Sequence, residues 1–185
     1  MGKCYDHLDA DLQAWIARQK MFFVATAPLA ASGHVNCSPK GGDFFRVLGE
    51  REVAYLDLTG SGVETISHLQ ENGRVLLMFC AFEGSPKIVR LHGKGEVVYP
   101  KDPRYAELIQ RFPNHRGARA IVRVEVTRIS GSCGFGVPLF DFVAQRDMLD
   151  AWAAKKGPEN LPAYRHEKNQ VSIDRLPGYL GDRAI

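Results

Sequence analysis

Residues 51–79 read REVAYLDLTGSGVETISHLQENGRVLLMF, and the rest of the chain can be arranged around them. Alternating apolar residues predict a strand over residues 53–58, and a short polar loop, Thr59-Gly60-Ser61-Gly62, follows it. Apolar residues at helical spacing then predict a helix over residues 63–72, and Asn72-Gly73 is typical of a helix end. The apolar run at 74–82 predicts a second strand, which we expect to be buried on both faces.

The loop before the predicted helix has two interpretations. Ser61 is followed three residues later by Glu64, which is a capping box that satisfies free N–H groups at a helix start. A helix that starts after a Gly/Ser/Thr loop can also bind a phosphate with those N–H groups. Taken alone, the loop favours the plain cap over the phosphate site.

The composition is that of an ordinary globular protein. The 185 residues carry a formal net charge of +3, and the Lys and Arg residues form no basic stripe, so a nucleic-acid partner is not expected. The four cysteines form no C-x-x-C pair, so neither a metal site nor a disulfide framework is expected. We see no signal peptide and no apolar run of membrane-spanning length, which predicts a cytoplasmic protein without a membrane partner.

The remaining patterns predict a barrel made mainly of β-strands with flanking helices. Asp6 or Asp9 is expected to cap a first helix that ends near residue 19. Two glycines, Gly93 and Gly95, interrupt the longest predicted strand and indicate a bulge that lets a sheet curl. The other predicted elements are strands at 21–27, 35–38, 44–48, 87–99 and 120–129, and a helix that starts at 102.

The chain is expected to divide at about residue 130. Residues 1–130 would form the barrel with its N-terminal helix. Residues 131–185 would form a loop, a helix over about 147–155 and an extended arm from 160 onward, packed on the barrel or on a partner subunit. A loosely held tail is the alternative for this last stretch.

No self-contained catalytic motif is present, so the catalytic residues stay unknown at this point. The six histidines are isolated from one another, and neither a nucleophile elbow nor a Walker loop occurs. The best anion-binding candidates are Lys40, the loop 59–62 and the backbone at 63–65. Residues 36–40 and 57–59 end two strands that can both face the same helix start. A ligand with a phosphate and a polar planar ring would suit that place, and a cofactor would then carry the reactive chemistry.

Several segments in this order resemble the pyridoxamine 5'-phosphate oxidase-like family. They are FFVATA at 22–27, VNCSPKG at 35–41, VAYLD at 53–57, TGSGVET at 59–65 and LHGKGEV at 91–97. The resemblance implies a split β-barrel of six to seven antiparallel strands, which binds FMN at the interface of a homodimer. It places the strand 36–40 along the flavin ring, Asp57 and Leu58 in contact with the flavin, and the helix start near the phosphate. The implied cofactor-binding residues are Asn36, Cys37, Ser38, Pro39, Lys40, Asp57, Leu58, Thr59, Ser61, Val63, Glu64 and Thr65.

The chain also departs from the family pattern. Val35 stands where the oxidase has an arginine, and Glu64 and Thr65 stand where it has an Arg-Lys pair. Phosphate binding would then rely on Ser61, Thr65, Lys40 and backbone donors. We therefore expect an FMN-dependent oxidoreductase of unknown substrate, and we do not expect oxidation of vitamin B6. The alternatives are a non-catalytic module that holds flavin, haem or a deazaflavin, and a dimeric structural protein whose ancestral site is not used.

Overall fold

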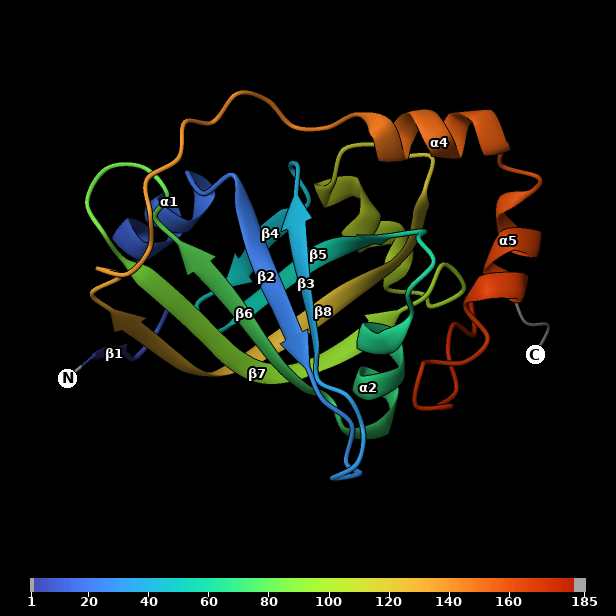
Figure 1. The fold of residues 1–185 in the computed structure, drawn as a ribbon, viewed down its shortest axis with the longest axis horizontal. Coiled ribbons are helices and arrows are strands. Elements are labelled where there is room, and N and C mark those ends of the chain that lie inside the picture. The colour runs from blue at the N-terminus through green and yellow to red at the C-terminus, as the bar shows by residue number, and fades with distance from the viewer. Residues whose placement is uncertain (1, 182–185) are drawn as a thin grey trace.

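The computed structural model describes residues 2–181, and these form one antiparallel sheet with helices around it (Figure 1). The sheet order is β3-β2-β6-β7-β8-β5-β4, and β1 pairs separately with β8. The strands are β1 (Lys3–Tyr5), β2 (Met21–Thr26), β3 (Asn36–Gly41), β4 (Phe45–Gly49), β5 (Glu52–Leu58), β6 (Arg74–Cys80), β7 (Ile88–Val98) and β8 (Ala118–Ser132). The helices are α1 (Ala10–Ala17), α2 (Glu64–Asn72), α3 (Tyr105–Leu108) with a 3₁₀ turn at Ile109–Arg111, α4 (Met148–Lys156) and α5 (Leu161–Lys168).

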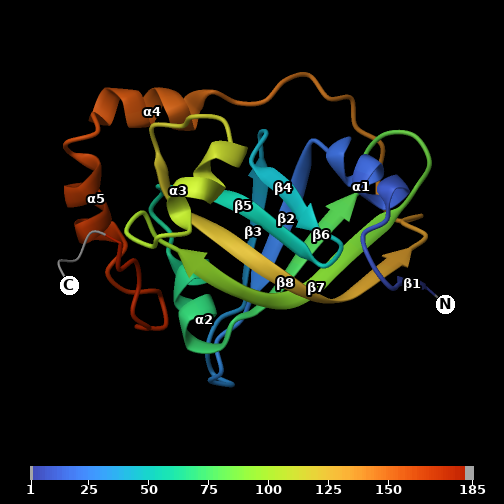
Figure 2. The same cartoon turned by 180° about the vertical axis from the view of Figure 1, so that it is seen from behind.

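The sheet curls into a half-open barrel, as seen from both sides in Figures 1 and 2. The register of β7 against β8 shifts between His92 and Gly93, so the predicted bulge is present. A Cβ atom at Gly93 would collide with the carbonyl oxygen of Glu125, which explains why glycine is required there. The prediction of a mainly β split barrel with flanking helices is confirmed. The short strand β1 was not predicted from the sequence.

Strand β6 differs from its prediction, because only one of its faces is buried. Val75, Leu77 and Phe79 point into the core, where Phe22 and Phe79 stack with ring centroids 5.5 Å apart. The alternate residues Leu76 and Met78 are only half-buried. The expectation of burial on both faces is wrong, because no helix of residues 2–181 covers the outer face of this antiparallel sheet.

Helix α2 begins two residues later than the predicted capping box requires, because that box would make Ser61 the N-cap. Its N-cap is Val63, and no side chain caps it from that position. The Glu64 carboxylate turns back and accepts a hydrogen bond from the Val63 N–H at 3.0 Å, whereas Ser61 is exposed. The predicted role of Ser61 as the cap is therefore wrong. At the other end, Gly73 has a φ of 71° and closes the helix as expected.

At the N-terminal end of the chain, Asp9 caps α1 as predicted, because its carboxylate accepts a hydrogen bond from the Leu12 N–H at 2.8 Å.

The C-terminal segment (residues 133–181) passes over the open end of the barrel and continues into α4 and α5 (Figure 1). The arm predicted to be extended from 160 contains the helix α5, so this part of the prediction is wrong. No helix within residues 2–181 is long and apolar enough to cross a membrane.

Candidate functional site

A cavity of about 830 Å³ lies at the open end of the barrel, between β3, the loop before α2 and the C-terminal segment. This volume is in the range of small-molecule sites. The wall contains ten of the twelve residues predicted from the sequence: Asn36, Ser38, Pro39, Lys40, Asp57, Leu58, Thr59, Val63, Glu64 and Thr65. The predicted strand end and helix start thus converge on one cavity.

The strand β3 is the edge of the sheet, and its side chains alternate between the cavity and the outside. Asn36, Ser38 and Lys40 are half-buried and lie on the same side as the buried residues of β2. Cys37 is exposed on the opposite face, so its side chain does not line the cavity. Ser61 is also absent from the cavity wall.

A buried ion cluster closes the base of the cavity. The Asp57 carboxylate is 1% exposed and lies 2.6 Å from Nε of Arg119 and 3.6 Å from Nζ of Lys40. Burial alone would raise the pKa of Asp57, but the charges of Arg119 and Lys40 outweigh it and hold the pKa below its ordinary value. Asp57 is therefore a carboxylate at neutral pH, and the two cations leave the cluster with a positive charge in excess.

The sequence analysis did not identify Arg119 as a candidate site residue. In the pairing of β5 with β8, Asp57 faces Ala120 and Leu58 faces Ala118, so Arg119 is the extra residue of a bulge. A bulge turns a side chain away from the alternation that sequence patterns detect. The residue directly precedes the strand predicted at 120–129, and no local signal separates it from a surface arginine.

The loop before α2 is held by side chains from distant parts of the chain. The Asn169 amide donates to the carbonyl oxygens of Gly60 at 2.9 Å and Ser61 at 3.2 Å. The Asn36 amide donates to the Thr65 hydroxyl at 2.9 Å, which joins the edge strand to the start of α2. The loop geometry is therefore fixed both from β3 and from the C-terminal segment.

The mouth of the cavity is lined by the C-terminal segment of the same chain. The Gln145 amide donates to the carbonyl oxygen of Lys20 at 2.7 Å, and Phe142 lies under the Lys20 ammonium group. Asp150 of α4 faces His115, whose Nδ1 accepts from the Gly117 N–H at 3.0 Å. Burial lowers the pKa of His115, with a smaller opposing effect of Asp150, so this ring is neutral at pH 7.

A curled antiparallel barrel with a polar cavity along its edge strand defines the class of split-barrel proteins. The sequence pattern of pyridoxamine 5'-phosphate oxidase matches residues 8–133, and this chain belongs to that family. The pyridoxamine 5'-phosphate oxidase family protein ustO of Aspergillus flavus is 41% identical over 193 residues, which cover 94% of this chain and 76% of that protein.

Solved structures share the fold at lower identity. HupZ of Group A Streptococcus is 22% identical with a TM-score of 0.51, over 65% of this chain and 90% of that one. A candidate pyridoxamine 5'-phosphate oxidase from Lactobacillus delbrueckii is 21% identical with a TM-score of 0.51, over 69% of this chain and 98% of that one.

Proposed function

We propose that this protein binds FMN in the cavity at the open end of the barrel and acts as an FMN-dependent oxidoreductase. The observation that carries the proposal is the convergence of the edge strand β3, the end of β5 and the start of α2 on a cavity with a buried positive cluster. Membership of the pyridoxamine 5'-phosphate oxidase family supports the same ligand.

The residues present fit a ligand with a planar polar ring and an anionic group. Asn36, Ser38 and the outer backbone edge of β3, which pairs with no strand of residues 2–181, offer donors and acceptors to a ring. Leu58 offers an apolar contact. Lys40 lies at the base of the cavity beside Asp57 and can pair with an anionic group of the ligand. The chemistry supplied by bound FMN is hydride or electron transfer, while the chain orients the ring and excludes water.

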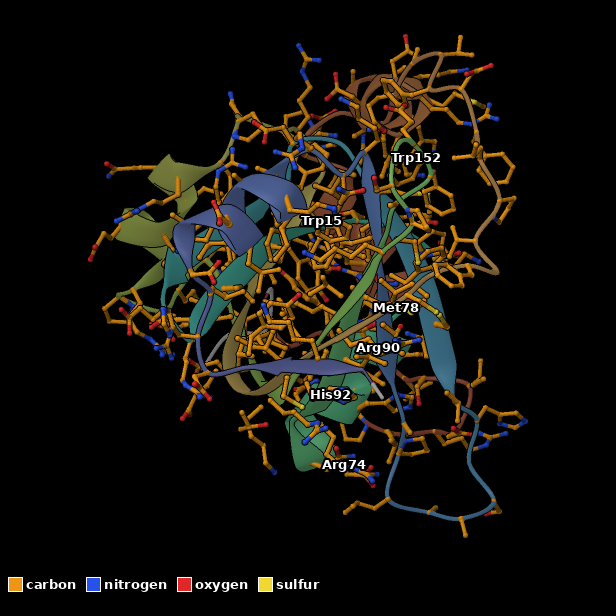
Figure 3. All side chains as sticks on the ribbon, turned by 90° about the vertical axis from the view of Figure 1, so that its left-hand side faces the viewer. Trp15, Arg74, Met78, Arg90, His92 and Trp152 are labelled. Atoms are coloured by element: carbon orange, nitrogen blue, oxygen red, sulfur yellow. The ribbon has the colours of Figure 1, made fainter. Side chains whose placement is uncertain are left out.

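We further propose a homodimer with the cofactor at the subunit interface. Phe23 and Met78 are register partners on the outer face of the sheet, are only half-buried and belong to no core cluster. Figure 3 shows Met78 close to its register partner Arg90, with His92 further along the same face. Half-buried apolar side chains beside charged ones on a sheet face that no helix of residues 2–181 covers support association with a second copy.

The alternative is a module that holds flavin, haem or a deazaflavin without turnover. It is favoured by the state of the acid and base groups in the cavity wall. Asp57 is bound to two cations, the Glu64 carboxylate is bound to the Val63 N–H, and Nδ1 of His115 is bound to the Gly117 N–H. Protonation of Asp57, or of His115 at Nδ1, would therefore break an existing contact, and Glu64 has only its second oxygen, Oε1, left to accept a substrate proton.

The visible spectrum of the purified protein, before and after addition of FMN, tests both readings. A flavin spectrum that NAD(P)H bleaches supports the oxidoreductase, and a bound flavin that resists all reductants supports the module. Colourless protein that does not bind added FMN refutes both flavin readings. All four cysteines are free thiols, which supports the proposal of a reducing, cytoplasmic setting.

A further inference from the structure

We propose that Arg119, held in place by Asp57 and Asn169, is the residue that binds the phosphate of FMN. This inference rests on the proposed function and adds an anion-binding residue that the sequence comparison with the family does not supply. It also gives the C-terminal segment a role in the site, because Asn169 lies outside the matched residues 8–133.

Three hydrogen bonds fix the Arg119 guanidinium from two sides. Nε donates to Asp57 at 2.6 Å, and Nη1 donates to the Gly62 carbonyl oxygen at 3.0 Å and to Oδ1 of Asn169 at 2.8 Å. The backbone of Arg119 is held as well, because its carbonyl oxygen accepts from the Tyr179 hydroxyl at 3.0 Å. The side chain therefore keeps one orientation.

The remaining nitrogen of the guanidinium, Nη2, has no hydrogen-bond partner within residues 2–181, although the side chain is only 5% exposed. Nη2 is not one of the fully buried side-chain atoms that lack a partner, so it keeps some contact with solvent. Arg119 also lines the wall of the cavity. A buried arginine normally satisfies all five N–H donors, because an unpaired donor in a dry site costs free energy. Because Arg119 lines the cavity, the two open N–H donors of Nη2 are available to form charge-assisted bonds to an anion bound there.

The start of α2 is a poor alternative for the phosphate. The Glu64 carboxylate already occupies the Val63 N–H and would repel a second anion brought to the same place. Arg119 lies directly beside this helix start, since it bonds to the Gly62 carbonyl oxygen. With Lys40 it outweighs the charge of Asp57, so the cluster as a whole attracts an anion.

Asn169 is a positioning residue in this arrangement. Its side chain is completely buried and connects Arg119 to the carbonyl oxygens of Gly60 and Ser61. One amide group thus sets both the guanidinium and the loop against which the phosphate would lie. Its backbone is tied to the end of the described chain, because the Tyr179 N–H donates to the Asn169 carbonyl oxygen at 2.8 Å.

The test compares the affinities for FMN and for riboflavin, which differ only in the phosphate. Fluorescence titration of wild-type protein should show FMN bound about 10- to 100-fold more tightly, the range of charge-assisted hydrogen bonds. Arg119→Gln and Asn169→Ala should each remove most of this preference and leave riboflavin binding unchanged. Arg123→Gln is the matched control, because Arg123 is on the same strand and is paired with carboxylates outside the cavity wall. It should leave both affinities unchanged.

The outcomes separate this inference from the proposed function. Equal wild-type affinities for FMN and riboflavin overturn the role of Arg119 while flavin binding stands. A folded Asn169→Ala protein with the full FMN preference overturns the positioning role even if Arg119→Gln does not fold. Failure of the wild-type protein to bind either flavin overturns the proposed function and this inference together.

Discussion

Replacing Asp57 by asparagine removes the carboxylate that Arg119 and Lys40 share and leaves two cations at the base of the cavity. Asp57 is 1% exposed and Arg119 is 5% exposed, so water cannot take over the lost charge. Breaking a buried ion pair from one side costs about 3–5 kcal/mol. For a chain of this length that loss corresponds to a decrease of roughly 6–20 °C in melting temperature.

The control for Asp57→Asn is Glu52→Gln, which breaks an ion pair between the same two strands. Glu52 lies 2.7 Å from Arg123, but both side chains are about one-third exposed, and such pairs contribute about 1 kcal/mol or less. The assay is urea unfolding of both variants and of wild type at pH 7. If Asp57→Asn costs no more than Glu52→Gln, the assignment of a tightly coupled buried cluster is wrong.

The pH dependence gives a second check on Asp57. Its folded-state pKa is lower than the ordinary value of 3.8, because the two cations outweigh the effect of burial. The stabilisation is therefore fully present above about pH 3.8 and is lost as the pH falls through the lower folded-state pKa. The difference in stability between wild type and Asp57→Asn should narrow only below that pH. A difference that narrows already near neutral pH contradicts the reasoning.

Three further predictions follow from particular contacts. Lys40→Ala should weaken FMN binding by about 1–3 kcal/mol in a fluorescence titration, as expected for a charge-assisted contact; an unchanged affinity would contradict its place beside the phosphate. Gly93→Ala should destabilise the fold by roughly 2 kcal/mol or more in urea unfolding, because its Cβ would meet the Glu125 carbonyl oxygen at the bulge. Gly136→Ala, where a Cβ meets no atom, should be neutral in the same assay. Met78→Asp should shift the protein from dimer to monomer in sedimentation measurements, because it replaces an apolar contact beside Phe23 by a carboxylate that association would have to desolvate, and a dimer that persists would refute this interface.

Much of the barrel could be predicted because its signals are local. The edge strand, the kink at Gly93 and the turn at Gly73 follow from strand alternation and from the backbone freedom of glycine, which act over a few residues. The order of the segments also brought residues 36–40 and 57–65 together, and ten of the twelve predicted side chains line one cavity. Burial of β6 was misjudged because an apolar run does not show which face a neighbour covers.

By itself, the sequence determined the strand and helix types, the bulge and the family, since each depends on short-range periodicity or on matched segments. Only the tertiary structure decided how the base of the cavity is charged. Arg119 reaches Asp57 across 62 residues of chain through a bulge, and Asn169 meets Arg119 across another 50. Such pairings depend on the register between strands and on where the C-terminal segment docks. The local pattern around each of these residues is that of an ordinary polar position, so only the folded chain shows that they form one site.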